Sequence, residues 1–244
     1  MPGFRSALAR LFMIQAAFTY ERMLGVGFAF ASEPLLQGLR RREGGAPAFG
    51  AALAREASYF NAHPYLAALA VGALARAEND GVAPEQIERL RAALIGPLGL
   101  LGDRLIWAGW LPACAAVGLL LVALSAGGWA VVAFLVLYNL MHVTLRVWGL
   151  KVGWRAGVGV AGALAAPALH RALEVVAPLA ALVVGAALPA VLGWFPFRAH
   201  WEVFAAAAAA LAFAELVRLL QGRATGLVVA AFALAVVVGV GMLW

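Results

Sequence analysis

The chain has 244 residues, of which 65% are hydrophobic and only 12% are charged. Soluble domains carry about 25% charged residues, so this composition excludes an ordinary soluble protein and indicates a multi-spanning membrane protein. The formal net charge of +6 does not indicate a nucleic-acid interface, because the arginines are scattered between apolar segments. Such arginines are more typical of loops that determine membrane topology. The single cysteine, Cys114, excludes an intrachain disulfide.

Two apolar segments near the N-terminus, residues 11–31 and 57–75, are long enough to cross a membrane but are interrupted by polar residues. These are Gln15, Thr19, Glu21 and Arg22 in the first segment and Ser58, Asn61, His63 and Pro64 in the second. Irregular backbone is tolerated at membrane depth only where protein or a watery cavity covers it. We therefore expect each segment to form a re-entrant hairpin or a broken helix packed against other protein. Residues 37–55 between them are expected to form a basic connector.

A third polar interruption lies inside the apolar stretch 92–126. It consists of Gly96, Pro97, Gly99 and Gly102, followed by Asp103 and Arg104. Glycine and proline disfavour a smooth helix, and ionisable residues at membrane depth tend to line pathways or pair with each other. Asp103 is expected to cap a helix that begins near residue 105, or to contact a substrate.

Residues 76–91 precede this interruption and alternate acidic and basic side chains. They predict a solvated, cytoplasmic amphipathic helix, and Pro84 marks a plausible helix start.

More regular spans follow the third interruption. The candidates are residues 105–126, 129–149, 175–194 and 225–243, with 203–217 as a weaker one. A length of about 20 residues is enough to cross the hydrocarbon layer, and Gly127-Gly128 predicts a tight turn between the first two spans. Basic residues gather on alternate loops, which places those loops in the cytoplasm and the C-terminus outside. The expected organisation is one all-α membrane domain, irregular over residues 1–104 and transmembrane over residues 105–244.

Three polar interruptions in one membrane chain favour a transport site. Transporters commonly build such sites from discontinuous helices, whose free backbone groups and helix ends supply hydrogen bonds. A neutral polyol suits such a site, because it needs donors and acceptors in fixed directions and aromatic rings for its apolar faces. The aromatic residues that flank the interruptions are Tyr20, Phe60, Tyr65 and Trp107.

Neither a metal site nor a nucleotide site is expected. The histidines, His63, His142, His170 and His200, are far apart in the sequence. Residues 157–162 spell G-x-G-x-x-G, but a dinucleotide site needs a preceding strand, and small residues at this density are more typical of closely packed helices.

Each interruption also carries a recognisable motif. Residues 15–23 read QAAFTYERM, residues 60–64 read FNAHP, and residues 95–103 read IGPLGLLGD. A further element consists of Asn139, Arg146, Gly149 and Gly153. In their order and spacing over residues 5–160, these elements resemble the IID subunit of the mannose/fructose/sorbose family of the sugar phosphotransferase system (PTS).

The resemblance implies a specific role. Members of that family form a membrane complex with a IIC subunit, and the sugar binds and crosses within the unit that both subunits build. IIA and IIB proteins phosphorylate the sugar through histidines that relay phosphate from phosphoenolpyruvate. This chain is therefore expected to be a multi-pass, hetero-oligomeric subunit of the bacterial inner membrane that serves a hexose-type sugar. It is expected to need no cofactor and not to be an enzyme by itself.

The site residues are expected at the interruptions. Substrate binding is assigned to Gln15, Glu21, Asn61 and Asp103. Shaping of the site is assigned to Arg22, His63, Pro64, Gly96, Pro97, Gly102 and Trp107. Glu21 and Arg22 equally suit a structural ion-pair network, and Asn61, with two donors and an acceptor, also suits a helix cap. His63 suits a structural role better than that of a proton carrier.

Several positions depart from the family pattern. Thr19 stands where an asparagine is usual, and Tyr59 replaces the first phenylalanine of the second element. Gly99-Leu100 stands where alanine-glycine is expected, and Arg104 follows Asp103 where a small residue or proline is usual. These departures motivate an alternative hypothesis, a transport-inactive IID-like scaffold or regulatory partner in the membrane.

Overall fold

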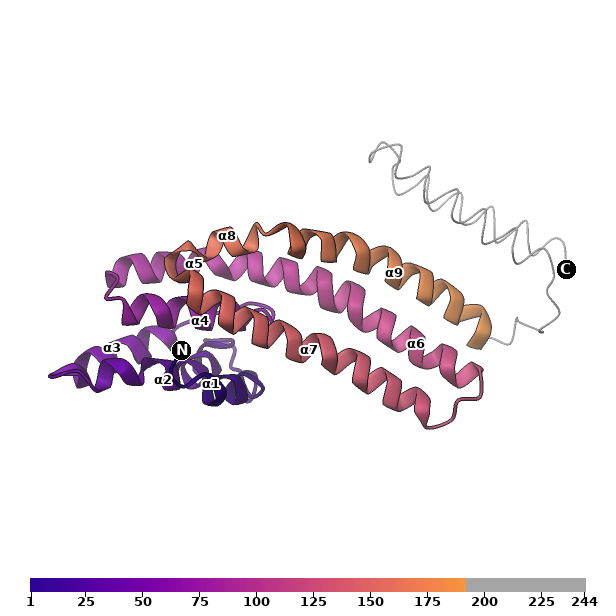
Figure 1. Ribbon diagram of the computed structural model, residues 1–244, viewed down its shortest axis with the longest axis horizontal. Coiled ribbons are helices and arrows are strands. Elements are labelled where there is room, and N and C mark those ends of the chain that lie inside the picture. The colour runs from indigo at the N-terminus through magenta and orange to yellow at the C-terminus, as the bar shows by residue number, and fades with distance from the viewer. Residues whose placement is uncertain (192–244) are drawn as a thin grey trace, which may run out of the picture. The chain divides into compact units, whose positions relative to one another are not determined.

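The computed structural model describes residues 1–191, in which every regular element is a helix. The helices are α1 (Phe4–Leu11), α2 (Gly25–Arg40), α3 (Gly45–Glu56), α4 (Ala67–Asn79), α5 (Pro84–Gly102), the π-helix η1 (Asp103–Trp110), α6 (Leu111–Ala123), α7 (Trp129–Ala156), the 3-10 helix η2 (Gly157–Gly159), α8 (Val160–Leu164) and α9 (Pro167–Val191). Helices α1 to α4 gather at one end, and three long helical runs extend from there side by side (Figure 1). These runs are α5–η1–α6, α7, and α8–α9.

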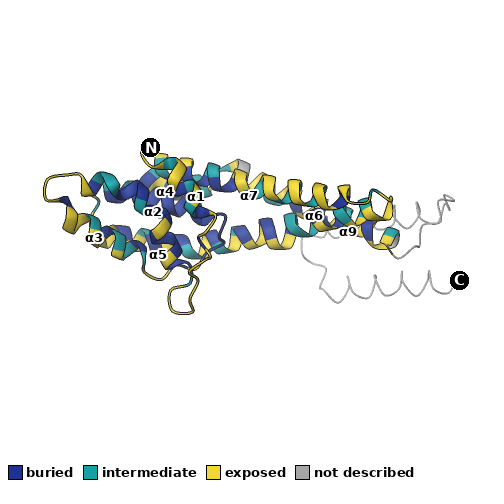
Figure 2. Cartoon of the chain, turned by 90° about the horizontal axis from the view of Figure 1, so that it is seen from below, coloured by how far each residue is buried: buried dark blue, intermediate teal, exposed yellow. Residues whose placement is uncertain are grey.

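Helix α4 lies at the centre of the core. Its residues from Ala67 to Ala75 are buried throughout, whereas the outer parts of α6 and α7 carry many exposed residues (Figure 2). A short, apolar, fully enclosed helix is possible here because its neighbours α2, α5 and α7 all pack against it.

The contact between α4 and α7 is a close approach of two backbones. A Cβ atom added at Gly153 would lie 2.0 Å from the carbonyl oxygen of Leu69, and one added at Gly72 would lie 2.5 Å from the carbonyl oxygen of Leu150. Gly149 faces the same helix, 3.0 Å from the Leu69 nitrogen by the same measure. Small residues allow such close approach of membrane helices, so glycine at these positions sets the crossing of α4 and α7.

Within residues 1–191, three helical runs are long and apolar enough to cross a membrane: Pro84–Ala123, Trp129–Leu164 and Leu169–Leu188. The turn between the first two contains Ser125 and Gly127, both with positive φ, which confirms the turn expected at Gly127-Gly128. The expected span 129–149 is confirmed as part of α7, which continues to Ala156. The span expected at 175–194 begins earlier, because α9 starts at Pro167. The candidates at 203–217 and 225–243 lie outside the described residues.

The first two interruptions are confirmed, since residues 12–24 and 57–66 are not helical. Two neighbouring predictions are wrong. The expected connector at 37–55 is mostly helix, because α2 reaches Arg40 and α3 begins at Gly45. The single helix expected at 76–91 is divided by a turn at Gly81, whose φ is +73°, although the start at Pro84 is confirmed.

The third interruption is a change of helix type and not a break. Helix α5 passes through Gly96 and Pro97 and continues directly into the π-helix η1 and then α6. Asp103 has helical dihedral angles and its side chain makes no cap hydrogen bond. The prediction that Asp103 caps a new helix near residue 105 is therefore wrong.

The crossing of α4 and α7 gives a test by substitution. Gly153→Ala should lower the melting temperature of the purified protein by several degrees, because overpacking costs about 1–3 kcal/mol. Gly50→Ala is the matched control, because a Cβ at Gly50 meets nothing within 4 Å. Melting at the same temperature for wild type and Gly153→Ala would contradict the backbone contact.

Candidate functional site

The first two interruptions are joined to each other through their backbones. The Phe60 N–H donates to the Arg22 carbonyl at 3.2 Å, and the Leu24 N–H donates to the Phe60 carbonyl at 3.0 Å. Between them Met23 has a φ of +51°, and the Thr19 hydroxyl accepts the Arg22 N–H at 3.2 Å. Glu21 and Arg22 are therefore held next to the segment that carries Asn61.

Arg91 of α5 anchors the second interruption. Its Nη1 donates to Glu56 Oε2 at 3.0 Å, and its Nη2 donates to the carbonyl oxygens of Glu56 and Ser58 at 2.9 Å each. The guanidinium also lies over the rings of Phe28 and Phe60, 4.5 and 4.9 Å from their centroids. One buried side chain thus fixes the end of α3 and the chain that leads to Asn61.

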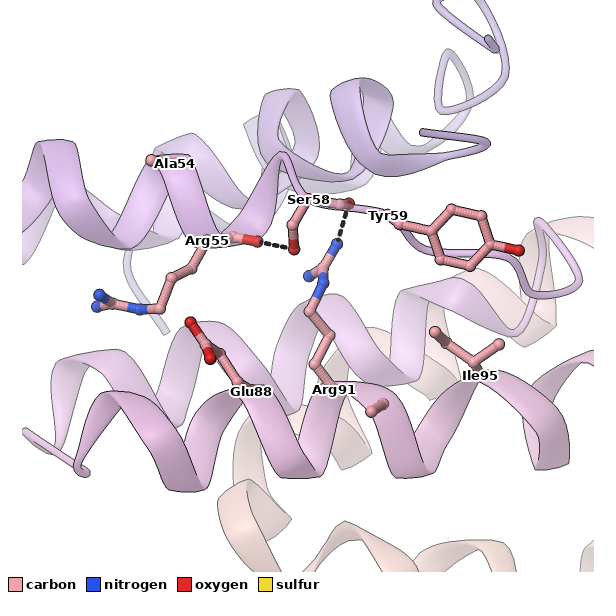
Figure 3. Close-up of a pocket in the computed structure, with 8 residues that line it drawn as sticks. Ala54, Arg55, Ser58, Tyr59, Glu88, Arg91 and Ile95 are labelled. Atoms are coloured by element: carbon pink, nitrogen blue, oxygen red, sulfur yellow. Dashed lines mark hydrogen bonds between the residues drawn. The ribbon is translucent and has the colours of Figure 1, made fainter. Parts of the chain in front are cut away.

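Arg91 lies beside a cavity of about 600 Å³ between α3 and α5. Figure 3 shows Arg91 pointing toward Ser58, with Arg55 and Glu88 on one side and Tyr59 and Ile95 on the other. Arg55 donates two hydrogen bonds to Glu78, at 2.8 and 2.6 Å. Burial raises the pKa of Glu56 to about 7, against the lowering effect of Arg91.

The second interruption packs directly on the third. A Cβ added at Gly102 would lie 2.1 Å from the Cβ of His63, so glycine is needed there. The His63 and Trp107 rings are 5.2 Å apart. The His63 Nδ1 accepts the Tyr65 N–H at 3.3 Å, and burial, together with nearby Arg146, lowers the pKa of His63 to about 4. A neutral, packed imidazole agrees with the expected structural role.

Arg146 of α7 anchors the start of the first interruption. It is 1% exposed, and its Nε donates to the Leu11 carbonyl, at the end of α1, at 3.1 Å. Its guanidinium lies over Tyr65 and Phe12, at 4.5 and 5.1 Å from the ring centroids. Within residues 1–191 it makes no ion pair. The aromatic faces and the carbonyl supply its negative charge density.

The side chains expected to bind substrate remain exposed. They are Gln15, Glu21, Asn61 and Asp103, and none of them makes a side-chain hydrogen bond within the described residues. Arg22 is exposed and forms no ion pair with Glu21 there, so the described part shows no structural network for that pair. The structure thus links the segments that carry Glu21, Asn61 and Asp103 and leaves these three side chains exposed within residues 1–191.

The expected shaping residues divide into two groups. His63, Pro64 and Gly102 are buried at the junction of the second and third interruptions. Gly96, Pro97 and Trp107 are exposed, and a Cβ at Gly96 meets nothing within 4 Å. Among the flanking aromatic residues, Phe60 and Tyr65 belong to the core, whereas Tyr20 and Trp107 are exposed.

The sequence did not predict the anchoring roles of Arg91 and Arg146, or the pairing of Arg91 with Glu56. Arg91 was interpreted as part of a solvated helix, and Glu56 was not singled out, although the two form a buried ion pair. No local pattern joins them, since they are 35 residues apart. For Arg146, the sequence feature that could have predicted a buried anchoring role is its position as a cation within an otherwise apolar span.

Comparisons with known proteins agree on one family. The family model described as "PTS system mannose/fructose/sorbose family IID component" matches residues 3–240. The PTS system sorbose-specific EIID component of Klebsiella pneumoniae is 30% identical over 176 residues, which cover 70% of this chain and 63% of that protein. The PTS system mannose-specific EIID component of Escherichia coli (strain K12) is 27% identical over 187 residues, covering 75% of this chain and 65% of that protein. The chain thus spans slightly less than two thirds of the length of each.

Two solved structures are similar to the chain. One is described as "CryoEM Structure of Mannose Transporter ManYZ and Microcin E492 (MceA) complex", with a TM-score of 0.59 and 26% identity over 75% of this chain and 68% of the other. A second, "Structure of membrane protein", has a TM-score of 0.66 at 20% identity over 98% of this chain and 96% of the other. The second shows a shared fold.

The Gly102 contact gives a test of how the interruptions are packed. Gly102→Ala should displace His63 and speed amide hydrogen exchange across residues 60–66, because a Cβ has no space there. Gly99→Ala, on the same helix with nothing within 4 Å of the added Cβ, should leave exchange unchanged. Equal protection in both variants would disprove the contact.

The Arg91 hydrogen bonds give a second test. Arg91→Lys should lower the free energy of unfolding by about 3 kcal/mol. The lysine ammonium cannot replace the planar guanidinium, which donates hydrogen bonds to the Glu56 carboxylate and to two carbonyl groups. Arg89→Lys, at an exposed position of the same helix, should change the free energy of unfolding by less than about 0.5 kcal/mol. The two variants would be compared by denaturant titration in the same detergent, and equal effects would contradict the anchoring role.

Proposed function

Because the chain belongs to the mannose/fructose/sorbose family of PTS system IID components, we propose that it forms the sugar-translocation unit of a permease together with a IIC subunit. The observation that carries this proposal is the linkage of three polar interruptions beside membrane-spanning helices. Met23 and Phe60 join the first to the second, and His63 on Gly102 joins the second to the third.

The exposed polar side chains support a role in sugar passage. Asn61 offers two donors and an acceptor for hydroxyl groups, and Glu21 and Asp103 offer acceptors. Tyr20, 87% exposed, and Trp107, 45% exposed, present ring faces of the kind that stack on a sugar. Gln15 is exposed on the first interruption and is proposed to contribute in the same way.

Exposed charges on a membrane protein also require cover. Glu21, Arg22 and Asp103 are costly in hydrocarbon unless protein or water surrounds them. We propose that a IIC subunit supplies this cover, and that sugar passes where the two subunits meet. Phosphate transfer is assigned to IIA and IIB proteins, and no catalytic residue is assigned to this chain.

The proposed location is the bacterial inner membrane. The basic ends of α5, α7 and α9 would face the cytoplasm, in line with the positive-inside rule, and the C-terminus would lie outside. The hexose class of the substrate follows from the family and is part of the proposal.

Asn61→Ala tests the proposal directly. The chain and its IIC subunit would be co-expressed and purified, and binding of labelled mannose, fructose, sorbose and glucose would be measured. The wild-type complex should bind one of these sugars saturably. The variant should still assemble but bind about tenfold more weakly or worse, because each lost hydrogen bond is worth roughly 1 kcal/mol.

Gln86→Ala is the matched control, since it removes an exposed amide from the first turn of α5 and should not alter binding. Unchanged binding in Asn61→Ala would remove Asn61 from the site. A stable complex that binds no sugar would favour a transport-inactive scaffold, and failure to form a complex would overturn the proposal.

A further inference from the structure

A basic cavity lies at the far end of α7 from the turn at residues 124–128. It has a volume of about 560 Å³ and is lined by Met1, Phe4, Arg76, Lys151, Trp154 and Arg155. These residues come from the start of the chain, the end of α4 and the end of α7. None of them belongs to the three polar interruptions described above.

Positive charge dominates this cavity. Arg76 forms an exposed ion pair with Asp80 at 2.7 Å, whereas Lys151 and Arg155 make no ion pair within the described residues. The sequence contains no aspartate or glutamate in residues 1–20 or 104–173. The α7 wall therefore contributes two cations, Lys151 and Arg155, and neither α1 nor α7 contains an acidic side chain to balance them.

The same cavity has an apolar, aromatic side. The Lys151 ammonium lies 5.6 Å from the Phe4 ring centroid, and the Arg76 guanidinium lies 5.8 Å from the Trp154 ring centroid. Phe4 and Trp154 are partly buried, and Met1 adds a further apolar side chain. Cations beside aromatic rings suit a ligand that has both an anionic head and apolar neighbouring groups.

The position of the cavity indicates where such a ligand comes from. Lys151, Trp154 and Arg155 lie in the last two turns of α7, within the apolar run Trp129–Leu164. Tryptophan and basic residues at the end of a membrane helix are typical of the lipid–water interface. Basic pockets between membrane helices on the cytoplasmic side bind anionic lipid head groups.

We propose that this cavity binds the phosphodiester head group of an anionic phospholipid. Lys151 and Arg155 would donate to the phosphate oxygens, Arg76 would add charge from α4, and Phe4 and Trp154 would contact the glycerol and the upper acyl chains. A bound lipid would then bridge α1, α4 and α7. The site is separate from the proposed sugar path and goes beyond the proposed function.

The test measures how tightly lipids bind to the wild-type protein and to two variants that each lose two charges. Each protein is purified together with any membrane subunit that copurifies with it. Phosphatidylglycerol and phosphatidylcholine of the same chain length would be titrated and bound lipid counted by native mass spectrometry. Lys151→Gln with Arg155→Gln removes two charges from the cavity. Arg41→Gln with Arg89→Gln removes two charges from exposed positions elsewhere.

The wild type should bind phosphatidylglycerol in preference to phosphatidylcholine. The cavity variant should bind phosphatidylglycerol about 30-fold more weakly, because it loses two basic residues that each have the typical attraction to an anionic membrane surface. The control variant should bind phosphatidylglycerol as tightly as the wild type. Glycerol 3-phosphate and inorganic phosphate at millimolar concentration should not displace the lipid.

Several outcomes would overturn the proposal. Equal losses in both variants would mean attraction by net charge alone, and equal binding of the two lipids would mean an apolar fit alone. Displacement of the lipid by glycerol 3-phosphate would indicate a soluble phosphate ligand. If another subunit covers Lys151 and Arg155 and no phosphatidylglycerol is bound, the cavity would be a protein interface. Sugar binding, measured on the same samples, separates failure here from failure of the proposed function.

Discussion

The close approach of α4 and α7 is the constraint on which the described structure depends. With Gly72 facing Leu150 and Gly153 facing Leu69 at backbone distance, α4 is drawn into the interior and its side chains are enclosed. The two irregular segments lie immediately before α2 and α4, so their positions are set once α4 is set. Small residues at this crossing therefore do more than let two helices pack, because they also locate the polar segments relative to the membrane-spanning helices.

Two arginines then hold the irregular segments in place. Residues 12–24 and 57–66 are not helical, so carbonyl groups within them, and at the ends of α1 and α3 that precede them, need donors from elsewhere. Arg146 supplies one at Leu11, and Arg91 supplies two at Glu56 and Ser58. Burying a guanidinium is costly, and here each is offset by carbonyl groups and aromatic faces, with a carboxylate added for Arg91.

The sequence predicts the class and the position of the irregular segments better than it predicts their form. Polar residues within the apolar runs 11–31 and 57–75 indicated two irregular segments, and the structure confines these to residues 12–24 and 57–66. The third interruption was expected to break the helix because Gly96, Pro97 and Gly102 have poor helix propensity. Backbone groups in an apolar surrounding must remain hydrogen-bonded, and a π-helix keeps them so while changing the direction of side chains. The pairing of Arg91 with Glu56 depends on how α3 packs against α5, and no local sequence pattern predicts it.

The π-helix and the glycine before it also explain why polar groups on separate segments are linked. Gly102 leaves room for His63, and η1, which begins with Asp103, places the Trp107 ring 5.2 Å from the His63 ring. Asp103, Asn61 and Glu21 then remain exposed on segments fixed to one another. Exposing such groups to hydrocarbon is expensive, and none of these three side chains makes a hydrogen bond within residues 1–191. The proposed IIC subunit and the proposed sugar would each supply hydrogen bonds to these same side chains, so one set of exposed groups would serve both proposals.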